Sequence, residues 1–105
     1  MEPILVQTTF EQKEDAQTLA TLLLEKRLIA CAQIVGPVTS LYWWKKQIDQ
    51  AEELILIMKS HQANYARLEQ EIIQHHPYET PEIIVMPVVQ GSNAYLSWLN
   101  NELKQ

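Results

Sequence analysis

Two hydrophobic periods alternate along the chain, and their order predicts which segments are strands and which are helices. Short apolar runs rich in β-branched residues are typical of strands. Such runs occupy residues 3–10, 29–34, 38–44, 48–59 and 81–89. Gly36-Pro37 separates the second run from the third. The pattern therefore predicts four strands, the second of which is broken at Gly36-Pro37.

Three other segments follow the helical period of 3.6 residues. Residues 11–26 predict one helix and residues 61–75 a second, which Pro77 ends because proline is incompatible with a continuing helix. Ser92 or Asn93 can cap a third helix that runs to Leu103. The residues expected to face the core are Ala16, Leu19, Ala20 and Leu23 in the first helix, and Tyr65, Leu68, Ile72 and Ile73 in the second.

The resulting order, β-α-β-β-α-β with a C-terminal helix, predicts an α+β fold of the ferredoxin-like type over residues 1–105 as a single domain. Right-handed crossovers place both internal helices on one face of a four-stranded antiparallel sheet. The run Leu54 to Met58 is apolar without interruption, which indicates a central strand covered on both faces. We therefore expect other copies of the chain to cover the second face.

Composition and charge exclude several functional classes. Eight Lys and Arg against thirteen Asp and Glu give a net charge of -5, which argues against a nucleic-acid partner. No apolar run is long enough to cross a membrane, and Met1 to Ile4 does not resemble the start of a signal peptide. The two glycines, Gly36 and Gly91, are too far apart for a glycine-rich nucleotide loop, so we expect no nucleotide cofactor. The single cysteine is consistent with a cytoplasmic location.

Three aromatic residues precede the expected hairpin tip at residues 45–47. Trp43 and Trp44 are neighbours on a strand, so their side chains point to opposite faces and cannot both enter one core. With Tyr42 they predict contact with a ligand or with another subunit. The alternative is one Trp in the core and one half-exposed.

The segment His75-His76-Pro77-Tyr78-Glu79 is the most polar candidate site. Adjacent histidines at a helix end point about 100° apart, so they suit one metal ion poorly by themselves, but each could contribute a ligand to Cu²⁺ or Zn²⁺. The alternative is that both histidines cap the last carbonyl groups of the helix.

Five further residues are candidates for a pocket or an interface. Cys31 lies between two alanines, where a packing role is favoured over a thiolate that would need His76 as its base. Lys59 and Glu53 share a strand face and could line a polar pocket. Tyr95 and Trp98 lie one helical turn apart on the last helix. No nucleophile and base can be paired from spacing, so we do not expect an enzyme.

Five ordered motifs resemble the CutA family of divalent-cation tolerance proteins. They are Ala30-Cys31-Ala32, Thr39-Ser40-Leu41-Tyr42-Trp43-Trp44, Met58-Lys59, His76-Pro77-Tyr78-Glu79 with Pro81-Glu82, and Leu96-Ser97-Trp98-Leu99. The resemblance implies a cytoplasmic homotrimer in which a long hairpin arm carrying Tyr42, Trp43 and Trp44 embraces the neighbouring subunit. It also implies metal binding and a role in tolerance of divalent metals, copper above all.

The resemblance implies His75 and His76 as the metal ligands, whereas the cysteine that some family members add corresponds here to Thr8, a poor copper ligand. The leading prediction is a trimeric protein that binds divalent cations. The alternative, by analogy with trimers of PII-type signalling proteins, is a sensor that binds an anionic metabolite through Lys59, Trp44 and Tyr78 in a cleft between subunits.

Overall fold

A computed structural model describes residues 1–104 and confirms the predicted order of elements. The strands are β1 (Pro3–Phe10), β2 (Cys31–Trp44), β3 (Gln47–His61) and β4 (Ile84–Pro87), and the helices are α1 (Lys13–Glu25), α2 (Tyr65–His75) and α3 (Asn93–Glu102). A short 3₁₀ turn, η1 (Gln62–Asn64), leads into α2. The strands pair antiparallel in the order β2-β3-β1-β4, which is the ferredoxin-like arrangement. The sequence-based fold class is confirmed.

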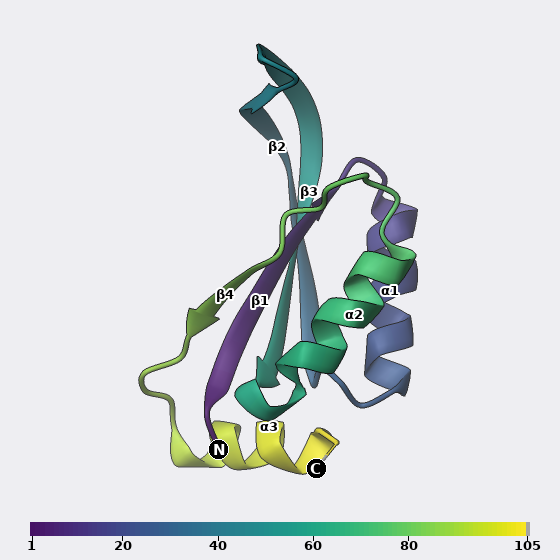
Figure 1. The fold of residues 1–105 in the computed structure, drawn as a ribbon. Helices are drawn as coiled ribbons and strands as arrows, with labels where there is room; N and C mark the ends of the chain where they lie inside the picture. Colours follow the sequence, from purple (N-terminus) through teal and green to yellow (C-terminus); the bar gives the residue numbers. More distant parts are fainter. Residues whose placement is uncertain (105) are drawn as a thin grey trace.

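Both internal helices cover the same face of the sheet, and the hydrophobic core lies between (Figure 1). From α1, the residues predicted for the core, Ala16, Leu19, Ala20 and Leu23, are all buried. From α2, Leu68 and Ile72 are buried and Tyr65 packs against the core. The prediction for Ile73 is wrong: its side chain is exposed, because it lies one residue beyond the buried stripe of Leu68 and Ile72.

The predicted break at Gly36-Pro37 is a bulge within one continuous strand. Val35 pairs with Ile55 and Val38 with Glu53, so β2 uses one more residue than β3 at this point. Gly36 has a φ of 134°, and a Cβ atom at this position would lie 3.0 Å from the backbone oxygen of Glu53. Glycine is therefore required, and the strand bends without ending.

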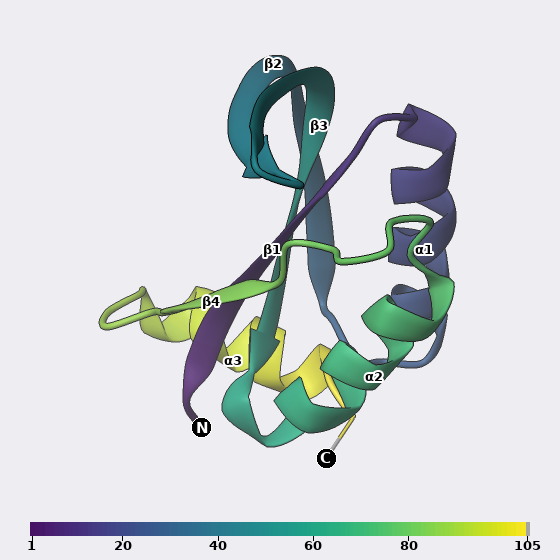
Figure 2. The same ribbon diagram turned by 45° about the horizontal axis from the view of Figure 1, so that its top comes forward.

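Beyond the bulge, β2 and β3 form an arm that projects from the sheet and curls over (Figures 1 and 2). Strand β1 ends opposite Leu54, so residues 38–53 pair only with each other. The tip consists of Lys45 and Lys46, with φ values of 50° and 68°, because Gln47 already pairs with Trp44. Two successive positive φ angles are the signature of a type I′ turn, whose twist matches that of the strands.

The other face of the sheet is only partly covered. Helix α3 crosses it at the end opposite the arm (Figure 1). The side chains of Val35, Ile84 and Met86 are exposed on this face. Pro87 closes β4, which lies at the edge of the sheet and is shorter than the expected 81–89. Among residues 1–104, no helix is long and apolar enough to cross a bilayer.

Candidate functional site

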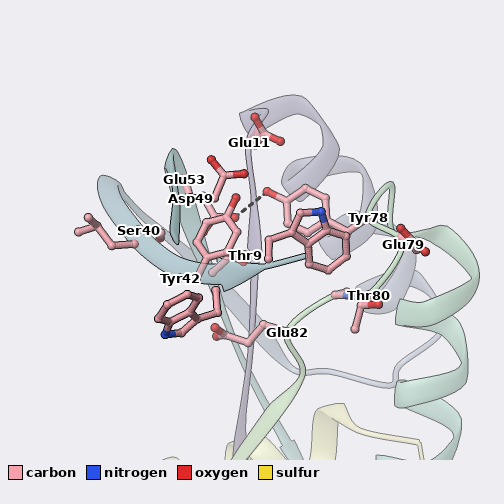
Figure 3. Close-up of a pocket in the computed structure, with 14 residues that line it drawn as sticks. Thr9, Glu11, Ser40, Tyr42, Asp49, Glu53, Tyr78, Glu79, Thr80 and Glu82 are labelled. Carbon is pink, nitrogen blue, oxygen red and sulfur yellow. Dashed lines mark hydrogen bonds between the residues drawn. The ribbon is translucent and has the colours of Figure 1, made fainter. Parts of the chain in front are cut away.

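A cavity of about 710 Å³ lies between the arm and the segment that follows α2. Its walls combine aromatic rings with carboxylates (Figure 3). The aromatic residues are Tyr42, Trp43, Trp44 and Tyr78, and the acidic residues are Glu11, Asp49, Glu53, Glu79 and Glu82. The structure thus brings together six of the sequence-predicted residues: Tyr42, Trp43, Trp44, Glu53, Tyr78 and Glu79.

Glu53 and Tyr78 connect the two sides of this cavity. The Tyr78 hydroxyl donates a hydrogen bond of 2.6 Å to Oε2 of Glu53 (Figure 3). Glu53 is 8% exposed although it carries a carboxylate. Burial, followed by the bond to Glu53, raises the pKa of Tyr78 far above its ordinary value, so the phenol stays protonated and remains a donor.

Neither tryptophan of the arm enters the core. Trp43 is 71% exposed and Trp44 is 38% exposed, so the alternative of one core Trp is wrong. Trp43 faces Ile48, its pairing partner on β3, which is also exposed. The arm therefore presents large apolar side chains that nothing within residues 1–104 covers.

His76 turns inward and uses both ring nitrogens. Nε2 lies 2.8 Å from the backbone oxygen of Thr9, and Nδ1 accepts a hydrogen bond from the Tyr78 amide at 3.1 Å. Because a carbonyl oxygen only accepts, Nε2 must carry the proton of a neutral ring. The ring also stacks on Phe10, with centroids 4.2 Å apart. In this arrangement His76 has no lone pair to offer a metal, and it holds the Tyr78 segment against β1.

His75 lies at the end of α2, with its side chain partly exposed. Its Nε2 lies 3.3 Å from Oε2 of Glu71, while Oε1 of Glu71 forms a 2.7 Å ion pair with Lys26. The hydrogen bond from Lys26 lowers the pKa of Glu71. Of the two histidines, only His75 keeps a ring nitrogen within reach of a metal. The structure therefore does not bring the predicted pair together as joint ligands.

The remaining predicted residues form a second cluster under α3. Lys59 donates to Oε1 of Gln33 at 3.1 Å, and its ammonium lies 5.9 Å from the ring centroid of Tyr95. Cys31 Sγ lies 3.7 Å from the Tyr95 hydroxyl, and Tyr95 packs on Trp98. Burial, followed by this contact with Cys31, raises the pKa of Tyr95.

The position of Lys59 in this second cluster corrects the interpretation that it shares a pocket with Glu53. Six residues of extended strand separate Lys59 from Glu53 by about 20 Å, so they do not line one pocket. Lys59 is also absent from the lining of the cavity that holds Trp44 and Tyr78, and that lining is acidic. Lys59, Trp44 and Tyr78 are therefore not brought together within one chain, and the anion site predicted for them in a cleft between subunits stays a prediction.

The donor set limits which metal sites one chain can build. Within residues 1–104, no three His, Cys, Asp or Glu side chains converge closely enough to hold one ion. Thr8 is fully buried, and its hydroxyl has no hydrogen-bond partner. Cys31 does not compensate, because it belongs to the cluster under α3. The described residues of a single chain therefore do not fit a dedicated copper site with several protein ligands.

Sequence reasoning missed Glu11 and Asp49 as part of the cavity. Asp49 pairs with Tyr42 in the hairpin register, so the correct tip at Lys45 and Lys46 would have identified it. Glu11 gives no such local signal, because it reaches the cavity only through the position of β1 in the sheet.

Comparison with known proteins gives one consistent result. The CutA1 divalent ion tolerance protein family matches residues 4–102. The divalent-cation tolerance protein CutA of Citrobacter koseri is 39% identical over 103 residues, which cover 98% of this chain and 90% of that protein. CutA1 from Oryza sativa superposes with a TM-score of 0.96 at 31% identity, covering 100% of this chain and 96% of its own.

A third relative is described as the periplasmic divalent cation tolerance protein CutA of Archaeoglobus fulgidus. It superposes with a TM-score of 0.93 at 31% identity, covering 97% of this chain and 99% of its own. A family match over nearly the whole chain, with the same fold in distant organisms, leaves one conclusion. The chain belongs to the CutA1 family of divalent ion tolerance proteins.

Proposed function

We propose that this protein serves in tolerance of divalent cations as a homotrimer that acts by binding cations and not by catalysis. Membership of the CutA1 family supports the role in cation tolerance. The observation that carries the proposed assembly is the uncovered arm, which holds exposed Leu41, Trp43 and Ile48.

A second copy of the chain is the simplest partner for burying this arm. Trp43 and Ile48 are paired across the hairpin and are 71% and 67% exposed, so they form one continuous apolar patch. Val35, Ile84 and Met86 add exposed apolar surface on the open sheet face. Patches of this kind mark interaction sites, and copies related by symmetry can bury both the arm and the sheet face.

The assembly can be tested with charged substitutions in the arm. Sedimentation equilibrium of the wild type should give three times the chain mass of 12.2 kDa. Ile48→Glu should dissociate the assembly, because it places a charge in the patch. Ile73→Glu is the matched control, since Ile73 is an exposed isoleucine on α2, outside the arm. A wild type that sediments as one chain at every concentration contradicts the proposal.

Within this function, we propose that Cu²⁺ contacts His75 and Glu71 and that His76 has a structural role. His75 and Glu71 are one helical turn apart, with Nε2 3.3 Å from Oε2. Apart from this contact, Oε2 of Glu71 has no hydrogen-bond partner within residues 1–104. An imidazole nitrogen and one carboxylate oxygen make a two-donor set, so water must fill the other positions of the ion and binding will be weak.

Calorimetric titration with Cu²⁺ distinguishes the two histidines. His75→Ala should weaken binding by about tenfold, whereas His76→Gln should leave it within about twofold. Binding should also weaken from pH 7.5 to pH 5, because the imidazole must be neutral to coordinate. Loss of binding in His76→Gln, with His75→Ala unaffected, would reverse the assignment.

We also propose a cytoplasmic location. The thiol of Cys31 is free, and a reduced thiol is ordinary in the cytoplasm. The relative from Archaeoglobus fulgidus is described as periplasmic, so cell fractionation with antibody detection is the direct test. Recovery in the periplasmic fraction would overturn this part of the proposal.

A further inference from the structure

The cavity beside the arm carries negative charge that no ion pair within residues 1–104 balances. Its lining includes five carboxylates and no Lys, Arg or His. The ion pairs formed within residues 1–104 involve Glu71 and Glu102, neither of which lines the cavity. Lys45, the nearest cation along the arm, lies over the Trp44 ring at 5.7 Å and is not part of the lining.

Glu53 shows that this charge is available to a ligand. The residue is more than nine-tenths buried, and its carboxylate accepts a single hydrogen bond, at Oε2, from Tyr78. Oε1 carries no hydrogen bond within the described residues and is not among their fully buried unpaired atoms, so it remains accessible from the cavity. Partial burial, followed by the charges of Asp49, Glu53 and Glu11, also raises the pKa of Tyr42. The negative field therefore extends across the cavity.

The aromatic residues select the kind of cation. Tyr42, Trp43, Trp44 and Tyr78 line the same space as the carboxylates. The face of an aromatic ring attracts an ammonium group, and its hydrocarbon surface also packs against methylene groups. A compact, hydrated metal ion gains little from such walls, whereas an alkylammonium ion gains from both features.

The spacing of the carboxylates argues against one metal ion. Asp49 and Glu53 are four residues apart on β3, a separation of about 13 Å. Glu11, Glu79 and Glu82 come from two other segments, and no three acidic groups converge on a point within residues 1–104. A divalent ion needs several oxygens at about 2.0–2.6 Å. Separated charges along an aromatic wall suit a chain with several separated amino groups.

We propose that this cavity binds a linear organic polyamine, whose ammonium groups pair with Glu53, Asp49 and Glu82 and whose methylene segments lie on Tyr42 and Tyr78. The volume of about 710 Å³ is sufficient for a molecule of this class. The site is distinct from the His75 and Glu71 pair, so neither assignment requires the other.

The test uses the full chain, treated with chelator, in a Trp98→Phe background so that fluorescence reports only Trp43 and Trp44. Spermidine should bind saturably and change this fluorescence, whereas a neutral diol of similar length should not. Asp49→Asn and Glu82→Gln should each weaken spermidine binding by about tenfold. Both residues are exposed, so the fold should survive these changes.

Glu52→Gln is the matched control, because Glu52 lies on the same strand outside the cavity and accepts from Thr39. Equal weakening by Glu52→Gln would show non-specific attraction and overturn the proposal. Displacement of spermidine by Mg²⁺ at a comparable concentration would assign the cavity to divalent cations instead. If spermidine binds only when the assembly dissociates, a second copy fills the cavity and the proposal is wrong. Sedimentation of the same samples separates these outcomes from failure of the trimer proposal.

Discussion

The Tyr78 hydroxyl lies 2.6 Å from Oε2 of Glu53, a contact that joins the segment after α2 to the base of the arm. Glu53 is the partner of Val38 at the point where β2 resumes after its bulge. One phenol therefore binds one oxygen of the buried carboxylate and fixes the loop that forms one wall of the cavity.

Removal of this hydroxyl should destabilise the protein. Tyr78→Phe deprives a buried carboxylate of its donor, so we expect the free energy of unfolding to fall by about 1.5–3 kcal/mol. Tyr65→Phe is the control, because the Tyr65 hydroxyl donates to Glu69 within one helix. A pair of that kind contributes only about 0.2–0.5 kcal/mol. Urea unfolding measures both variants, and equal losses would contradict the special role of Glu53.

Acid should destabilise the fold through His76. Burial lowers the pKa of His76 below its ordinary 6.5, although the bond to Thr9 acts in the opposite direction. The unfolded chain then binds a proton that the folded chain resists, so stability is full above about pH 6.5 and falls as the pH drops towards the folded pKa. Protonation at Nδ1 would also remove the acceptor of the Tyr78 amide.

The measurement is urea unfolding between pH 7.5 and pH 5 in the presence of chelator. His76→Gln should be less stable at pH 7.5 but should lose less stability on acidification than the wild type. His75→Gln is the comparison variant, because His75 lies at the same helix end with its side chain partly exposed. An unchanged pH dependence in His76→Gln would show that other groups control the acid response.

The hairpin tip offers a stabilising substitution. Lys46 has a φ of 68°, a left-handed conformation that is strained for a residue with a Cβ atom. Lys46→Gly should raise the free energy of unfolding by about 0.5–1 kcal/mol, because relief of this strain outweighs the extra freedom that glycine gives the unfolded chain. Lys46→Ala should give no such gain. Urea unfolding of the two variants checks the conformation of the tip.

The bulge in β2 depends on Gly36. Gly36→Ala should cost about 1–3 kcal/mol, because its φ of 134° is unfavourable for alanine and the new Cβ would lie 3.0 Å from the Glu53 backbone oxygen. Gly91→Ala should cost less, since its Cβ would meet only the side chain of Leu96, which can move. Thermal unfolding of both variants provides the comparison. A larger loss at Gly91 would contradict this account of the bulge.

The sequence by itself determined the fold class and the arm. The apolar periods of β1 and α1 report local burial, and the elements follow them closely. The position of Tyr42, Trp43 and Trp44 directly before a short hairpin tip was enough to predict exposed aromatic residues on a hairpin. These features depend on neighbours within a few residues, which is the information that a linear pattern contains.

Tertiary structure alone decided which predicted residues meet. The orientation of His76 depends on Thr9, which is 67 positions away, and on the ring of Phe10. Glu53 and Lys59 share a strand, yet Tyr78 contacts Glu53 at the base of the arm, whereas Lys59 lies beside Tyr95 of α3. Hydrogen-bond partners are set by long-range packing, which alternation along a strand does not encode. The two histidines were therefore predicted to act together, as were Glu53 and Lys59, whereas the structure separates the members of each pair.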